Sequence, residues 1–204
     1  MTATKPYHHG ELRPALVAAA NAIIRESGIE KLSMRRLADQ VGVSRTAPYH
    51  HFKDKNALLC AIAEMGFEEQ NQMTREILDD PEDNNNEAVF ARWVRAYIRF
   101  AHENPETYDL MFGREIWKGG TPTPSLQAIS KTSFRLWVDL VAKMQQRGVL
   151  PGSHSALRTA QASWAALHGM ARLLIDGIYV QREDLEEIAE TVVDLLTRTT
   201  PDSH

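Results

Sequence analysis

Apolar residues recur at three- and four-residue steps along nearly the whole chain, and this spacing restricts the fold to packed α-helices. The first such stretch begins near Leu12 and ends at Ser27-Gly28, where a glycine can close a helix. Neither the strict alternation of a β-strand nor an internal repeat is present. The sequence of 204 residues therefore predicts an all-α protein of about nine helices.

Two short helices separated by a glycine turn follow the first helix. Ser33 can accept hydrogen bonds from the first turn of a helix over 34–40, and Gly42 ends that helix. Ser44 is then expected to cap a third helix over about 45–52. Helix, tight turn and helix make up the helix-turn-helix arrangement, whose second helix enters the major groove of DNA.

The charge of the chain is divided unevenly. Residues 1–55 carry nine Lys and Arg against five Asp and Glu, a net charge of +4, whereas the whole chain has −4 and the remainder therefore −8. A basic amino-terminal part indicates contact with a polyanion. A chance excess of charge is the alternative that composition alone leaves open.

The turn and the third helix supply the candidate DNA contacts. Arg45, Thr46 and His50 are expected to face base edges, because arginine can bond guanine in bidentate fashion and threonine can contact thymine. Hydroxyl and cationic groups around them suit phosphates, which fix register without specifying bases. Phe52 is expected to pack on the next helix, and Tyr49 either packs there too or contacts phosphate, which we favour. The predicted DNA-binding residues are Ser33, Arg35, Ser44, Arg45, Thr46, Tyr49, His50 and Lys55.

These residues resemble a known family. The stretch LSMRRLADQVGVSRTAPYHHFKDKNALL, with YHHGELRPALVAAA upstream, is similar to the amino-terminal domain of the TetR family of bacterial transcriptional regulators over about residues 7–65. The residues that carry the likeness follow the glycine turn in the family's order: Ser44, Tyr49, His51-Phe52, Lys55 and Leu58. Thr46 and Pro48 depart from many relatives, so the base preference of those relatives does not carry over.

The resemblance implies a domain organisation and a function. It implies a helix-turn-helix DNA-binding domain over 7–65, joined by a long helix to a larger helical ligand-binding and dimerisation domain over 66–200. An acidic linker at 79–87, DDPEDNNNE, follows that long helix. Further helices are expected at 86–103, 105–113, 125–147, 154–176 and 183–198.

Large aromatic side chains are concentrated in the larger domain. Aromatic residues at helical spacing usually pack in a core, but so many together can also line a cavity for a small, largely apolar ligand. The string WAALHG at 164–169 resembles a signature of one branch of the family. His168, Arg172 and Asp176 lie one turn apart, and either orient a polar ligand or form an internal row, which we favour. The candidate ligand-binding residues are Trp93, Tyr97, Phe100, Phe112, Trp137, Trp164, His168 and Arg172.

The last helix has the pattern of an association surface. Its apolar residues form one seam, and the preceding helix has an apolar face of its own, so that two chains could make a four-helix interface. A homodimer would set two recognition helices about 34–36 Å apart, which matches a palindromic operator in double-stranded DNA. The candidate dimer residues are Leu185, Ile188, Val192 and Leu196.

Several functions are excluded or made less favourable by what the sequence lacks. No apolar run approaches the roughly 18 residues of a membrane span, and the amino terminus lacks a secretion signal, so we expect a cytoplasmic protein. The single cysteine, Cys60, fits a core position, and no set of residues suits a metal or a cofactor. The leading hypothesis is a ligand-responsive transcriptional regulator and not an enzyme. The alternatives are a ligand-insensitive structural DNA binder and, less favoured, an enzyme with a DNA-binding domain.

Overall fold

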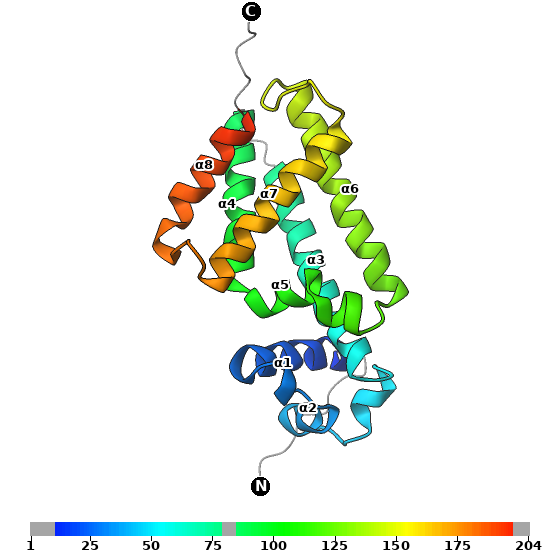
Figure 1. Cartoon of the computed structure of the whole chain (residues 1–204). Helices are drawn as coiled ribbons and strands as arrows, with labels where there is room; N and C mark the ends of the chain where they lie inside the picture. The colour runs from blue at the N-terminus through cyan, green and yellow to red at the C-terminus, as the bar shows by residue number, and fades with distance from the viewer. Residues whose placement is uncertain (1–10, 79–84, 198–204) are drawn as a thin grey trace, which may run out of the picture. The chain divides into compact units, whose positions relative to one another are not determined.

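The computed structural model describes residues 11–78 and 85–197 (Figure 1). Over these residues the chain forms eight α-helices and four short helical turns, without a β-strand, which confirms the all-α prediction. The chain divides into two compact units. The first unit contains residues 1–67 and 106–129, and the second contains 68–105 and 130–204. The sequence predicts one boundary near residue 65, whereas the chain passes between these units three times.

The first unit begins with three helices whose ends follow local sequence signals: α1 (Leu12–Ser27), α2 (Met34–Val41) and the amino-terminal part of α3 (Lys55–Leu78). The Ser33 hydroxyl accepts a hydrogen bond from the Arg36 amide at 3.1 Å and so caps α2. Gly42 ends α2 in the left-handed conformation, with φ of 76°. The Asp54 carboxylate accepts a bond from the Ala57 amide at 2.8 Å and caps α3.

The predicted third helix is wrong in extent and in its cap. Only a single 3₁₀ turn, η2 (Ala47–His50), forms there. Thr46 occupies the N-cap position without a side-chain cap, and the Ser44 hydroxyl instead bonds the Thr46 hydroxyl at 3.1 Å. The physical reason lies at Pro48, which has no N–H to continue an α-helical ladder and leaves the turn to bonds between residues three apart, such as Tyr49 to Thr46.

The segment after α5 (Pro105–Phe112) belongs to the first unit and docks on α3. The Asn56 amide donates to the Thr121 carbonyl at 2.8 Å. One carboxylate oxygen of Glu64 accepts hydrogen bonds from the Thr123 hydroxyl at 3.0 Å and from the Ser125 hydroxyl at 2.5 Å. These bonds join residues about 60 positions apart in sequence and hold the start of α6 (Pro124–Gln146) against the long helix.

Gly66 is the point of closest approach between α3 and α5. A methyl group added there would lie 2.5 Å from Met111 Sδ and 2.7 Å from Thr107 Cγ2, which is far inside van der Waals contact. We expect Gly66→Ala to lower the free energy of unfolding by about 1–3 kcal/mol through overpacking, which exceeds the gain of about 1 kcal/mol from better helix propensity. Urea denaturation followed by circular dichroism measures the change.

A double variant controls for the origin of this loss. Thr107→Ser removes one of the groups that a β-carbon added at Gly66 would strike, and it keeps the hydroxyl that donates to Asn21 at 3.0 Å. Gly66→Ala combined with Thr107→Ser should therefore recover part of the lost stability. If Gly66→Ala alone proved as stable as the natural protein, the close approach of α3 and α5 would be disproved.

The second unit is built on α4 (Asn86–Glu103), against which α7 (Ala156–Asp176) and α8 (Leu185–Thr197) pack. A stack of aromatic rings forms part of its core: Trp93 lies 4.2 Å from Trp137 and 5.3 Å from Tyr97 between ring centroids. Trp93 donates to the Thr74 hydroxyl at 2.9 Å, and Trp137 donates to the Ala160 carbonyl at 2.9 Å. Both indole N–H groups are thus satisfied, and the rings are fixed in place.

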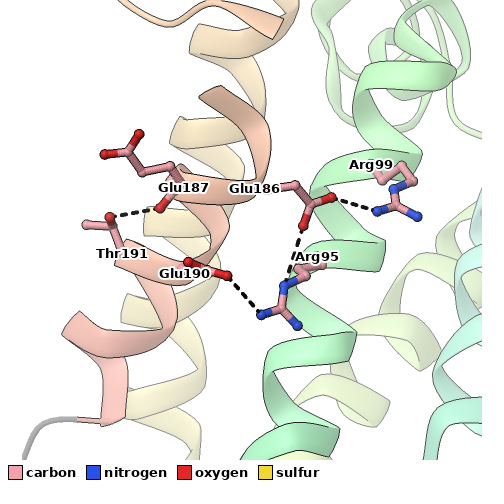
Figure 2. A network of polar contacts seen from close by, with 6 residues as sticks. All are labelled: Arg95, Arg99, Glu186, Glu187, Glu190 and Thr191. Carbon is pink, nitrogen blue, oxygen red and sulfur yellow. Dashed lines mark hydrogen bonds and ion pairs between the residues drawn. The ribbon is translucent and has the colours of Figure 1, made fainter. Parts of the chain in front are cut away.

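Ion pairs on the surface add to the contact between α4 and α8 (Figure 2). Arg95 reaches Glu186 at 3.6 Å and Glu190 at 3.5 Å, while Arg99 reaches Glu186 at 2.8 Å. Exposed pairs of this kind contribute little individually. The buried side of α8, which includes Val192, supplies most of the stabilisation, and the ion pairs fix which face of α8 turns toward α4.

Candidate DNA-binding surface and effector region

The predicted base-contacting side chains lie in and directly before the 3₁₀ turn η2: Arg45 and Thr46 precede it, and His50 is its last residue. Arg45, Thr46 and His50 are exposed, and Tyr49 is 56% exposed despite its size. Pro48 is buried beneath them, and its carbonyl accepts hydrogen bonds from the amides of His51 and Phe52. A buried proline therefore anchors a short, stiff turn whose polar side chains all remain accessible.

The remaining predicted DNA-binding residues differ in whether their side chains are available to contact DNA. Arg35 is exposed on α2, whereas the Ser33 hydroxyl is engaged as the α2 cap. The Lys55 ammonium donates to the Ile29 carbonyl at 2.8 Å and is half-buried, so it also holds the first unit together. Lys53, which the sequence argument overlooked, is exposed just after the turn and is an additional cation for phosphate contact.

Aromatic packing supports the exposed turn from within. Phe52 is buried, as predicted, and the guanidinium of Arg13 lies 5.3 Å from the centre of its ring. The same arginine lies 3.9 Å from the carboxylate of Glu64 on α3. These contacts tie the end of the turn to α1 and α3, so that the exposed side chains are displayed on a rigid support.

The predicted ligand-binding residues fall into three groups. Trp93, Tyr97, Phe100 and Trp137 are buried in the second unit, on α4 and α6. Phe112 belongs to the first unit, where its ring packs 5.3 Å from Phe67 and 4.8 Å from Tyr108. The sequence argument placed Phe112 with the others because periodicity does not show to which unit a helix belongs.

The third group is a row along α7. The Trp164 ring stacks on His168 at 4.8 Å, and Arg172 forms an ion pair with Asp176 at 2.8 Å. Burial lowers the pKa of His168 below its usual value, and the nearby charge of Arg172 lowers it further. His168 is therefore neutral at pH 7. These contacts run along α7, and Arg172 and Asp176 lie near the surface, with 34% and 40% of their side chains exposed.

The predicted dimer seam is only partly accessible. Leu185, Ile188 and Leu196 are half-buried, but Val192 is 6% exposed and packs inside its own chain. Val192 is thus wrongly placed on a surface that meets a partner, because an apolar seam on a helix looks the same whether its partner lies in the same chain or in another. Leu195, next to the seam, is 69% exposed.

A face of small residues on α7 is exposed. Its members are spaced three and four residues apart and so line one side of the helix: Ala162, Ala165, Ala166 and Gly169. A β-carbon added to Gly169 would meet no atom within 4 Å. Small side chains allow a second helix to approach closely.

The described part of the chain contains neither a candidate membrane-spanning helix nor a candidate metal site. Within residues 11–78 and 85–197, no helix has both the length and the apolar character needed to cross a bilayer. Over the same residues, no three His, Cys, Asp or Glu side chains gather in the manner of a metal site. Burial raises the pKa of the Cys60 thiol, which leaves it uncharged.

Two family models match the chain. The model described as "Bacterial regulatory proteins, tetR family" matches residues 16–62, which include most of α1, all of α2 and the turn η2. The model described as "Tetracyclin repressor-like, C-terminal domain" matches residues 90–196. The two together cover both the exposed turn and the aromatic second unit.

Individual relatives give the same result. The chain is 46% identical over 52 residues to the tetracycline repressor protein class C of Escherichia coli, covering 26% of this chain and 24% of that protein. It is 35% identical over 120 residues to the class G repressor of Vibrio anguillarum, covering 59% of this chain and 52% of that one. The matched stretches thus span between a quarter and a half of these repressors.

A solved structure matches nearly the whole chain. A protein of unknown function from Rhodococcus sp. RHA1 is 31% identical, with a TM-score of 0.78, and the match covers 96% of this chain and all of that one. The same helical architecture therefore occurs in a natural relative. The chain belongs to the TetR family of bacterial transcriptional regulators.

Proposed function

We propose that this protein is a homodimeric repressor that binds a palindromic operator in double-stranded DNA and is released by a small, largely apolar ligand. It would act in the cytoplasm, where a bacterial chromosome lies. The observation that carries the proposal is the segment 45–50, which ends in the turn η2 and in which Arg45, Thr46, Tyr49 and His50 are exposed while Pro48 is buried. Exposed polar side chains on a rigid turn that follows a glycine-ended helix suit major-groove recognition.

The exposed residues divide into two roles. Arg45, Thr46 and His50 read base edges, since they combine a bidentate donor, a methyl group and an imidazole. Arg35, Tyr49 and the Ser44 hydroxyl contact phosphates and set the register. Lys55 acts mainly through its bond to Ile29, and the exposed Lys53 takes over the phosphate contact that sequence alone assigned to Lys55.

A second copy of the chain covers the exposed faces of α7 and α8. The small-residue face of α7, together with Leu157 and Leu195, leaves apolar surface in the single chain that a partner would bury. The half-buried Leu185, Ile188 and Leu196 lie at the edge of this surface. Dimerisation places two copies of η2 on successive major grooves.

The effector site lies in the second unit, which holds the ring stack of Trp93, Tyr97 and Trp137. A ligand that binds one conformation more tightly shifts the equilibrium only by that difference in affinity. A tenfold preference for a conformation that cannot bind the operator would weaken DNA affinity by about 1.4 kcal/mol. Ligand-induced release from one palindrome distinguishes this function from that of a ligand-insensitive structural DNA binder.

The base-reading role predicts a selective defect. Arg45→Ala should reduce affinity for the operator by about 1–3 kcal/mol and relax the preference at one base pair. Fluorescence anisotropy with the palindrome flanking the protein's own gene, and with single-base variants of it, measures both effects. Arg45 is exposed, so the variant should remain folded.

Lys53→Ala serves as the matched control. Lys53 is exposed near the same turn, and its loss should weaken binding to all sequences alike and reduce the dependence on salt concentration. Were Arg45→Ala to bind every tested sequence as the natural protein does, η2 would not be the reading element, and the proposed function would lose its main support.

A further inference from the structure

One polar side chain in the second unit has no partner. Gln70 on α3 is 8% exposed, and its amide nitrogen Nε2 is fully buried with no hydrogen-bond partner among the described residues. A buried donor left without an acceptor costs about 1–3 kcal/mol, and native proteins rarely retain one without a reason. A leucine or methionine at this position would avoid the cost.

Gln70 lies one helical turn from the threonine that contacts the aromatic stack. It precedes Thr74 by one helical turn and therefore shares its face of α3. The Thr74 hydroxyl donates to the backbone carbonyl of Gln70 at 2.8 Å, and it accepts a hydrogen bond from the Trp93 indole at 2.9 Å. That face of the helix is thus joined directly to the rings of Trp93, Tyr97 and Trp137.

The neighbouring polar groups cannot satisfy Gln70. The Thr74 hydroxyl is already used as both donor and acceptor, and the indole N–H groups of Trp93 and Trp137 are donors themselves and are occupied. An acceptor from outside the chain would therefore satisfy the free Nε2 group. A ligand that carries an acceptor oxygen next to a planar apolar group would accept the hydrogen bond from the amide and would also pack on the rings.

The charge of such a ligand is also constrained. The described residues that are buried include amides, hydroxyls and apolar side chains, but no Asp, Glu, Lys, Arg or His. The guanidinium of Arg92, next to Trp93, has a buried Nε atom and reaches the Ile77 carbonyl on α3, whereas no carboxylate among the described residues is buried, so a positively charged ligand group would lack a buried counter-ion. We propose that Gln70 is the polar anchor of the effector site, and that the effector is a largely aromatic molecule without a positive charge and with a carbonyl-type acceptor. This inference rests on the proposed function, since it specifies the ligand that releases the operator.

A pair of small probes tests the anchor. Acetophenone and α-methylstyrene have the same shape and differ only in a carbonyl oxygen in place of a methylene group. Titration calorimetry should show that the natural protein binds acetophenone about tenfold more tightly, as one buried hydrogen bond allows. In Gln70→Met, which keeps the length of the side chain but removes the donor, the two probes should bind within about twofold of each other.

A control variant and a stability measurement complete the test. Gln72→Met changes an exposed glutamine on the same helix, which bonds Glu76 at 2.7 Å, and should keep the preference for acetophenone. The melting temperature of Gln70→Met without a probe should be equal to or above that of the natural protein, because no hydrogen bond is lost.

Several results would overturn the inference. These are equal affinity of the natural protein for both probes, no saturable binding of either, a preference that survives in Gln70→Met, or a melting temperature lowered by that variant. Operator binding by the natural protein without any probe is measured separately. Its absence would refute the proposed function, whereas its presence with any of the results above refutes only the role of Gln70.

Discussion

Gly169→Arg is expected to convert the proposed dimer into a monomer and to lower operator affinity by about 10²- to 10⁴-fold, because two half-sites would no longer be bound by linked subunits. Gly169 lies at an exposed position inside α7, where an added side chain meets no atom of its own chain within 4 Å. Replacing a helical glycine also improves helix propensity. The folded chain is therefore preserved, while a long cation occupies the face that the partner needs.

Sedimentation measures whether the variant is a monomer, and fluorescence anisotropy measures its affinity for the operator. Gly152→Arg is the matched control, since Gly152 is also exposed and open but lies outside α7. It should leave the dimer and its operator affinity unchanged. A Gly169→Arg protein that sediments as a dimer at micromolar concentration would show that the small-residue face of α7 is not the interface.

Val192→Asp is expected to cost about 3–5 kcal/mol of folding free energy, because it buries a carboxylate without a partner. Val192 is 6% exposed in the single chain, on the side of α8 that is buried together with Ala189 and Val193. A loss of this size is a large part of the stability of an ordinary domain. Urea denaturation monitored by circular dichroism should show a much lower midpoint, and protonation of the new carboxylate should make the loss smaller at acidic pH.

Ile188→Asp is the comparison, because Ile188 lies one turn earlier on α8 but is only half-buried. Its carboxylate can reach water, so the loss of stability should be smaller, and any effect should fall on association instead. If Val192→Asp unfolded at the same urea concentration as the natural protein, the packing of α8 within its own chain would be incorrect.

Local signals made the helices predictable. Ser33 and Gly42 each act within four residues of their own position, and the structure confirms both as helix boundaries. The interior of each helix follows from apolar spacing, which reports the face that is buried. These features require no knowledge of what the helix packs against.

The third helix shows how one residue alters a local prediction. A capping serine, a short polar run and a buried aromatic residue favour an α-helix over 45–52, but Pro48 cannot donate the bond that an α-helix needs at that position. The chain therefore forms the shorter turn η2. The outward side chains of Arg45 and His50 nevertheless remain exposed, so the candidate site survives the change in helix type.

Contacts between residues that are far apart in the chain could not be predicted from the sequence. Nothing near Glu64 indicates that Thr123 and Ser125 will donate to it, and nothing near Phe112 indicates that it packs against Phe67. A glycine within a strongly helical stretch, such as Gly66, can indicate close approach. Gln70 gave no signal, because a glutamine on a helix is ordinarily exposed.

The discontinuous first unit limits how this protein can be recombined with its relatives. Exchanging residues 1–67 alone would pair foreign α1 and α3 surfaces with the native 106–129 segment, and Met111, Thr121 and Thr123 would lose the Gly66, Asn56 and Glu64 that fit them. A working hybrid repressor should therefore carry both segments from the same parent. The natural crossover points for building new combinations of operator and inducer lie inside α3, at the start of α5 and inside α6.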